Sequence, residues 1–260
     1  MNEQERETYL LYSKLNSHKW RIEKALRVIE RGLEKMKLPY VSMSFGKDSL
    51  ALSHLIWSHY PEIPMMYVNC GKFDEWADTP RVKKEFLTLF PNCTFIELSA
   101  PSIWEFYKSV GFYVQDEETT KETRKAQREY AESLGLALDG EAKRRGFDGS
   151  FIGLRAEESH NRNRLFVMRG NLYYAKTRRE WACHPLEKWT SKDVWAYIVK
   201  NNLPYNELYD LAPEGRELAR NGAMFGTRSA RYGRLVFFKR VYPDLFNQFA
   251  AEFPEVRAYV

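Results

Sequence analysis

The sequence predicts an α/β protein built on a doubly wound, mainly parallel sheet with helices on both faces. Two observations carry this prediction. Four short apolar runs have the length and composition of buried strands, and segments with helical periodicity or helix-start signals separate them. Strands that alternate with helices in this way pair in parallel through right-handed crossovers. The expected strands are residues 40–43, 65–68, 94–98 and 150–154.

An amphipathic helix is expected over residues 14–37, because apolar residues recur there at spacings of three and four. Its apolar side is expected to cover the sheet, with a partner-binding arm as the alternative. Pro39 ends the helix. The apolar run 50–57 follows the first strand and predicts a second helix. A third is marked by Thr79 as N-cap and Pro80 in the first turn.

Two later segments are rich in charge. Residues 117–146 are expected to be a helical insertion, and their alternating acidic and basic residues favour a solvated surface over a nucleic-acid surface. Residues 213–240 are mainly basic. They form either a surface helix or a segment that closes over a second anionic group or a nucleic acid backbone. These features divide the chain into an N-terminal helix (1–38), a nucleotide-binding domain (39–205) and a helical C-terminal extension (206–260).

The most specific chemistry lies in Ser-Phe-Gly-Lys-Asp-Ser at residues 44–49, which joins the first strand to its helix. A loop that opens a helix directs free N–H groups and the positive end of the helix dipole at one point, where an anion is favoured. Gly46 allows close approach, Lys47 adds a positive charge, and the flanking serines offer hydroxyl donors. Phosphate is therefore the predicted ligand, although the Walker A and dinucleotide-binding patterns are both absent.

This stretch resembles the PP-loop of the ATP pyrophosphatase superfamily, whose signature is Ser-x-Gly-Lys-Asp-Ser. The resemblance implies that the loop holds the pyrophosphate end of ATP and that reaction occurs at the α-phosphate. Two further segments, residues 153–162 and 184–198, resemble the phosphoadenosine phosphosulfate (PAPS) reductase family, which includes the small subunit of ATP sulfurylase and FAD synthetase. In the second segment Thr190 and Asp193 form a capping arrangement for a helix with a scaffolding role.

The resemblance implies an enzyme that uses ATP and Mg²⁺ to adenylylate an acceptor and releases pyrophosphate. Lys47 and Arg155 are the predicted catalytic residues, and Arg155 would neutralise charge that develops on the phosphates. Asp48 is the predicted magnesium ligand. Substrate-binding or supporting roles are predicted for Glu157, Glu158, Arg162, Arg228 and Arg231. The predicted nucleotide-binding residues are Ser42, Ser44, Phe45, Gly46, Lys47, Asp48, Ser49, Asn69, Gly71, Gly153 and Arg155.

Two other classes of function stay open. Thiosulfonate-forming reductases of the resembled family carry a nucleophilic cysteine near the C-terminus, whereas this chain has no cysteine after Cys183. A sulfur-transfer enzyme, either a reductase variant or a nucleic-acid thiolation component, would instead relay sulfur through Cys70 or Cys183. The second class is a non-catalytic nucleotide-binding subunit of a larger complex. Asn69 stands where many relatives have Asp, which weakens a metal or substrate role at that position.

Composition sets the remaining expectations. The formal net charge of +5 suits an anionic substrate and permits nucleic acid contact without demonstrating it. No window of 18 uninterrupted apolar residues occurs, and the first residues are polar, so a cytoplasmic protein without membrane contact is expected. The sequence leaves open the acceptor (sulfate, a flavin mononucleotide or a nucleic acid base), a protein partner subunit and a homo-oligomer.

Overall fold

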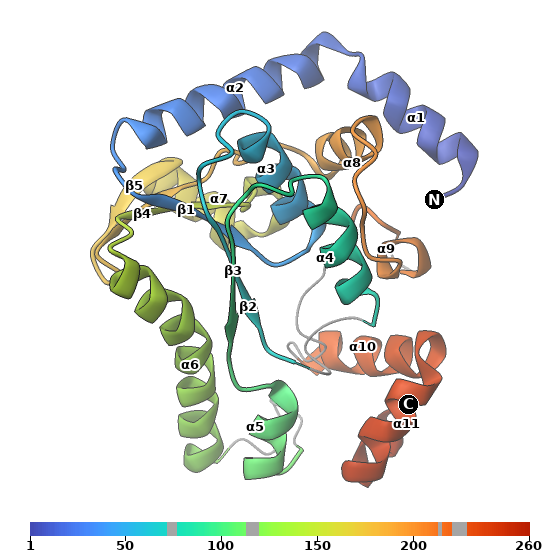
Figure 1. Ribbon diagram of the computed structural model, residues 1–260. Helices are drawn as coiled ribbons and strands as arrows, with labels where there is room; N and C mark the ends of the chain where they lie inside the picture. Colours follow the sequence, from blue (N-terminus) through green and yellow to red (C-terminus); the bar gives the residue numbers. More distant parts are fainter. Residues whose placement is uncertain (72–76, 113–119, 213–214, 220–227) are drawn as a thin grey trace.

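The computed structural model describes residues 1–71, 77–112, 120–212, 215–219 and 228–260 (Figure 1). Its centre is a six-stranded sheet with the order β3-β2-β1-β4-β6-β5, in which every neighbouring pair is parallel except β5 with β6. The expected doubly wound α/β fold is confirmed. The strands are β1 (Pro39–Met43), β2 (Met65–Asn69), β3 (Phe95–Ser99), β4 (Gly149–Ile152), β5 (Leu172–Ala175) and β6 (Glu180–Cys183).

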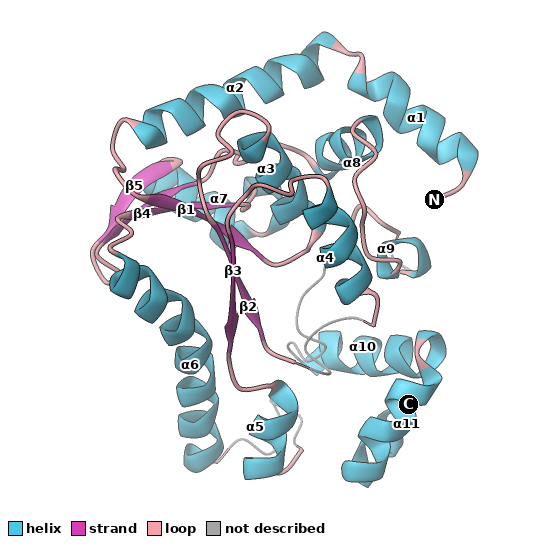
Figure 2. Cartoon of the chain, viewed as in Figure 1, coloured by secondary structure: helices cyan, strands magenta, loops and turns pink. Residues whose placement is uncertain are grey.

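Helices lie around the sheet and at both ends of the chain (Figure 2). None of the described helices is long and apolar enough to cross a membrane. They are α1 (Glu3–Ser13), α2 (Asn16–Leu33), α3 (Lys47–Trp57), α4 (Thr79–Thr88), α5 (Ile103–Val110), α6 (Lys121–Arg145), α7 (His160–Arg169), α8 (Ser191–Lys200), α9 (Leu208–Leu211), α10 (Arg228–Val241) and α11 (Pro243–Glu252), with 3-10 turns at Ala156–Glu158 and Pro254–Tyr259.

Both faces of the sheet are covered, as side-chain alternation along β1 requires. Val41 points into the large core that α2, α3 and α8 share, whereas Tyr40 points into a smaller cluster against α6. Both side chains are fully buried. Because β1 lies between β2 and β4, the loop that follows it emerges at the middle of the carboxyl edge of the sheet. Ligands of open α/β sheets bind outside this edge.

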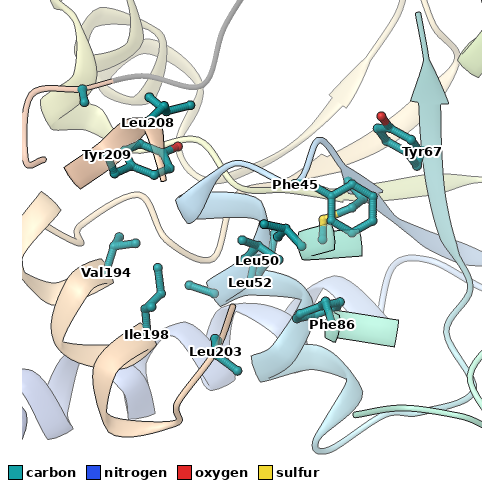
Figure 3. Close-up of a cluster of buried hydrophobic side chains, with 14 of the residues drawn as sticks. Phe45, Leu50, Leu52, Tyr67, Phe86, Val194, Ile198, Leu203, Leu208 and Tyr209 are labelled. Atoms are coloured by element: carbon teal, nitrogen blue, oxygen red, sulfur yellow. The ribbon is translucent and has the colours of Figure 1, made fainter. Parts of the chain in front are cut away.

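The helix after that loop is buried along most of its length. Leu50 and Leu52 of α3 are inaccessible to solvent and pack within one cluster with Ile198 of α8 (Figure 3). Phe45, which precedes α3, is also fully buried and has Tyr67 edge-on at 4.9 Å between ring centroids. Apolar packing on several sides therefore fixes where the first turn of α3 lies.

The predicted cap of α8 is confirmed. Thr190 is the N-cap and forms a reciprocal capping box with Asp193. The Asp193 carboxylate also accepts from Arg21 at 2.9 Å and lies 3.3 Å from His18 Nδ1, both on α2. Burial raises the pKa of Asp193, but hydrogen bonds from His18 and Thr190 and the charge of Arg21 outweigh it and hold that pKa at about 2. One carboxylate thus ties α2 to α8.

The structure corrects several sequence-based boundaries. The helix expected at 14–37 corresponds to α2, which is shorter and spans Asn16–Leu33. The preceding α1 was not predicted, because only Tyr9 and Ser13 of its residues are buried. Asp78, not Thr79, is the N-cap of α4, while Pro80 lies in the first turn as expected. Helices α5 and α7 and the β5–β6 hairpin also went unpredicted because each is short, although Ser102 and Glu105 form a capping box at the start of α5.

Candidate functional site

The loop of residues 44–49 turns sharply from β1 into α3. Phe45 has a φ of 52°, in the left-handed region, and Gly46 is the N-cap of α3 without a side-chain cap. The backbone N–H of Ser44 donates to the Ser49 hydroxyl at 3.2 Å, and that hydroxyl donates to the Gly46 carbonyl at 3.0 Å. The first turn of α3 therefore presents N–H groups at the sheet edge, as expected for an anion site.

A cavity of about 430 Å³ opens beside this loop and is called the loop cavity below. Such a volume falls within the usual range of small-molecule sites. Its walls come from the loop after β1, the segment after β4, the start of α7, and α9. The lining residues are Ser42, Ser44, Gly46, Lys47, Asp48, Ser49, Ile152, Gly153, Leu154, Glu158, Arg162 and Tyr209.

Lys47 lies in the wall of the loop cavity with only 2% of its surface exposed. Its ammonium donates to the Ala219 carbonyl at 3.2 Å and lies 3.3 Å from Asp48 Oδ2. The same ammonium is 5.4 Å from the centre of the Tyr209 ring. The Lys47 ammonium therefore has the Asp48 carboxylate beside it and lines the cavity, where it can also bind an anionic ligand.

Tyr209 was not predicted as a site residue. Its hydroxyl accepts a hydrogen bond of 3.1 Å from the backbone N–H of Lys47, across 162 residues of sequence. The Tyr209 hydroxyl thus accepts a hydrogen bond from one of the N–H groups that an anion at the start of α3 would use. Nearby, Asn206 donates to the Phe45 carbonyl at 3.0 Å, so the segment before α9 packs directly on the loop. No sequence pattern joins these positions, because tertiary folding alone brings them together.

Arg155 follows β4 and is 2% exposed, but it does not line the loop cavity. Its guanidinium bonds Asp48 and donates to Glu157 at 2.7 Å. Burial lowers the pKa of Arg155, yet the charges of Asp48, Glu158 and Glu157 more than offset this and raise it. We expected Arg155 to face the phosphates. Arg162 is the arginine that lines the cavity, paired with Glu158.

Gly153 is the point where β4 and the loop come closest. A Cβ at this position would lie 3.1 Å from the carbonyl carbon and oxygen of Asp48 and 3.2 Å from the Ser49 nitrogen. Three backbone atoms at these distances leave little room for a methyl group. Close approach of the two backbones therefore favours glycine at this position, the first residue of the segment 153–162.

Asp48 and its neighbours fit a magnesium ion that is held mainly by phosphates. One Asp48 oxygen bonds Arg155 and the other faces Lys47, so the carboxylate is placed beside the cavity and keeps further lone pairs. Glu158 offers a second carboxylate there. Mg²⁺ typically uses one or two carboxylates together with substrate phosphates and water. No cluster of three or more metal-binding side chains occurs in the described part of the chain.

Asn69 and Gly71 lie at the same edge of the sheet but line a different cavity. This second cavity, of about 720 Å³, is formed with the start of α5 and with α11. The Asn69 side chain accepts from the Gly71 N–H at 2.8 Å and donates to Glu97 at 2.8 Å. Cys70 borders the same cavity. The nucleotide-binding roles predicted for these residues stay predictions.

Neither Phe45 nor Cys183 lines the loop cavity. The ring of Phe45 is fully buried in the core, so only its backbone takes part in the loop (Figure 3). Arg228 and Arg231 belong to α10, but their side chains lie outside the part of the chain that is described. Cys183 is fully buried, and burial raises the pKa of its thiol to about 12.

Comparisons with known proteins agree with this architecture. The family model of the phosphoadenosine phosphosulfate reductase domain matches residues 38–241. Sulfate adenylyltransferase subunit 2 1 of Chromohalobacter salexigens is 26% identical over 213 residues, which cover 73% of this chain and 65% of the relative. The phosphoadenosine 5'-phosphosulfate reductase of Xylella fastidiosa is 26% identical over 180 residues, which cover 66% of this chain and 67% of the relative.

Longer relatives and solved structures complete the comparison. Protein MJ0973 of Methanocaldococcus jannaschii is 26% identical over 90% of this chain, which spans 54% of that relative, about half its length. The phosphoadenylyl-sulfate (PAPS) reductase of Candida auris, solved with phosphate, has a TM-score of 0.55 at 16% identity and covers 81% of this chain and 92% of its own. The U34-tRNA thiolase NcsA of Methanococcus maripaludis has a TM-score of 0.50 at 12% identity, with coverages of 94% and 80%. At these identities the structures support the fold alone.

Proposed function

The chain belongs to the family of the phosphoadenosine phosphosulfate reductase domain, and from that premise we propose that it binds ATP with Mg²⁺ in the loop cavity. The proposed reaction is attack of an acceptor on the α-phosphorus. The bond between that phosphorus and the oxygen bridging to the β-phosphate breaks, which leaves an adenylylated acceptor and pyrophosphate. The observation that carries the proposal is a helix N-terminus, a buried lysine and an arginine around one cavity.

The 44–49 loop is proposed to hold the β- and γ-phosphates. N–H groups of the first turn of α3 and the hydroxyls of Ser44 and Ser49 are the donors, and the Lys47 ammonium supplies charge. Because the Tyr209 hydroxyl bonds the Lys47 N–H in this structure, a phosphate oxygen would displace it. Bound Mg²⁺ would neutralise charge on the departing pyrophosphate, with Asp48 as its protein ligand.

The two arginines are proposed to have different tasks. Arg162 lines the cavity and is the cation placed to stabilise charge at the α-phosphate. Arg155 is proposed to act through Asp48, whose carboxylate it holds beside Lys47. Glu157 fixes that arrangement from the other side, since it accepts from Arg155 and from the Ser191 N–H at 2.6 Å. A direct contact of Arg155 with phosphate would require Asp48 to release it.

A non-catalytic subunit is the second candidate function. It is favoured by the likeness to a sulfate adenylyltransferase subunit, a protein named as part of a larger enzyme. Sulfur relay has less support from the described residues, because Cys183 is buried away from the loop cavity and Cys70 borders the other one.

Product analysis tests the proposed reaction. Purified protein is incubated with MgATP and, in turn, sulfate, flavin mononucleotide or an oligonucleotide, and the nucleotide and phosphate products are separated. The proposal expects pyrophosphate together with AMP or an adenylylated acceptor. Formation of ADP and inorganic phosphate would contradict cleavage at the α–β bond. Tight ATP binding without pyrophosphate from any acceptor would favour the non-catalytic subunit.

A further inference from the structure

Residues 159–179, which form α7 and the first half of the β5–β6 hairpin, contain six lysines or arginines and no acidic residue. The other 34 basic residues of the chain are balanced by all 35 acidic ones, so the remainder carries a formal charge of −1. This short segment therefore carries a local excess of six positive charges, in addition to the mainly basic residues 213–240. Such segregation is the electrostatic footprint of a surface that binds a polyanion.

Most of these cations have no carboxylate to neutralise them. Arg164 and Arg169 on α7, and Lys176 and Arg179 on the hairpin, are exposed. None of the four forms an ion pair with a residue that the structure describes. A solvated face in a protein with 35 acidic residues would normally interleave both signs. Four uncompensated charges within 16 residues of sequence instead favour an anionic partner.

Aromatic rings lie among the cations. The Arg169 guanidinium is 5.4 Å from the centre of the Tyr173 ring, which stacks on the buried His184 at an interplanar angle of 28°. Tyr174, on the next position of β5, is 47% exposed. These side chains form a cavity of about 420 Å³, called the tyrosine cavity below. It is lined by Arg169, Tyr173, Tyr174, Lys176 and Thr177. Positive charge beside an accessible ring is the combination that holds a nucleobase and its phosphate.

The segment is continuous with the loop cavity. Arg162, in the first turn of α7, lines the loop cavity, whereas Arg169 at the last residue of α7 lines the tyrosine cavity. Seven residues of α-helix separate them by about 10 Å along the axis. Exposed Val167 and Met168 lie on the same helix and offer apolar contact to bases.

We propose that the α7–hairpin surface, residues 159–179, binds a single-stranded nucleic acid and that this strand is the acceptor delivered to the loop cavity. The claim that the strand is the acceptor rests on the proposed function, whereas the claim that the surface binds it does not. Stacking on the exposed Tyr174 requires unpaired bases, which favours a single strand over a duplex. An acidic protein would satisfy the charges but would leave the tyrosine cavity without a planar ligand.

The test is fluorescence anisotropy with labelled single-stranded RNA and DNA of the same sequence. The variant Arg164→Glu/Arg169→Glu/Lys176→Glu is compared with a matched control, Lys19→Glu/Lys84→Glu/Lys200→Glu, which reverses three exposed lysines on α2, α4 and α8. We expect the first variant to lose affinity about tenfold or more and the control to change much less. The slope of log K against log salt should fall by about 2, because each lost phosphate contact removes about 0.7.

Further measurements separate the two claims. Tyr174→Ala alone, at an exposed position, should weaken binding with the salt slope unchanged, since it removes stacking and not charge. If the two triple variants bind equally well, or if the parent does not bind, the proposal that residues 159–179 bind nucleic acid is wrong. ATP affinity is measured on every protein. If the parent protein binds the nucleic acid strand but not ATP, the proposed function is wrong and the proposed nucleic acid surface still holds. Preference for RNA or DNA identifies the strand.

Discussion

Replacing Gly153 with alanine tests whether the end of β4 sets the position of the 44–49 loop. The added methyl group would meet three backbone atoms of Asp48 and Ser49 at 3.1 to 3.2 Å, so the first turn of α3 must shift by a few tenths of an ångström. Overpacking of this kind costs about 1–3 kcal/mol, and reduced freedom of the unfolded chain returns about 0.4–1 kcal/mol. The free energy of unfolding should therefore fall by at most about 2.6 kcal/mol.

Gly153→Ala should also weaken ATP binding. The shifted turn carries the donors proposed for the β- and γ-phosphates, so affinity for MgATP should fall by about tenfold, or about 1.4 kcal/mol. Titration calorimetry measures the affinity, and urea denaturation measures the stability. Gly140→Ala is the matched control, because a Cβ there would meet nothing within 4 Å. A Gly153→Ala protein that binds MgATP as tightly as the parent would refute the reasoning.

Further predictions concern buried polar groups. Tyr209→Phe frees the Lys47 N–H, so MgATP affinity should rise several-fold while unfolding free energy drops by about 1 kcal/mol; calorimetry and denaturation check both, and weaker ATP binding would mean that Tyr209 contacts the ligand itself. Burial lowers the pKa of His54 and of His184 to about 4, so unfolded protein binds more protons between pH 6.5 and 4. The free energy of unfolding should therefore be highest above pH 6.5 and fall by up to about 1.4 kcal/mol per histidine per pH unit between pH 6.5 and 4. In denaturation at a series of pH values, a His54→Gln/His184→Gln protein should show a smaller fall. Cys183, whose pKa is raised to about 12 by burial, should react with iodoacetamide only after unfolding, as mass spectrometry would report; rapid labelling of folded protein would contradict its placement in the core.

Local chemistry explains which parts of the site could be predicted from sequence. The 44–49 loop was predictable because strand, turn and helix signals are contiguous, and the cap of α8 because Thr190 and Asp193 lie three residues apart. Tyr209 could not be predicted, since its bond to the loop spans 162 residues. Asn69 lies at the same sheet edge as the loop but lines the second cavity, which α5 and α11 help to form, and no sequence pattern marks that separation.

The direction in which side chains point was the other feature of the site that could not be predicted from the sequence. Phe45 is contiguous with the loop, yet its ring lies in the same core as Val41 and Met43 of β1. Arg155 was expected at the phosphates, and its pairing with Asp48 and Glu157 could not be read from spacing alone. The basic segment 159–179 was overlooked in favour of residues 213–240, because its charges are spread over a helix and a hairpin that had not been predicted.

Binding of MgATP to Lys47→Met most directly tests the claim that the 44–49 loop binds the outer phosphates. Methionine keeps the buried side chain's length and removes its charge, so the fold should persist. Lys188→Met, at a lysine whose side chain is 59% exposed, is the control. Titration calorimetry should show a loss of about tenfold or more for Lys47→Met and parental affinity for the control. Equal affinity of Lys47→Met and parent for MgATP would contradict the account.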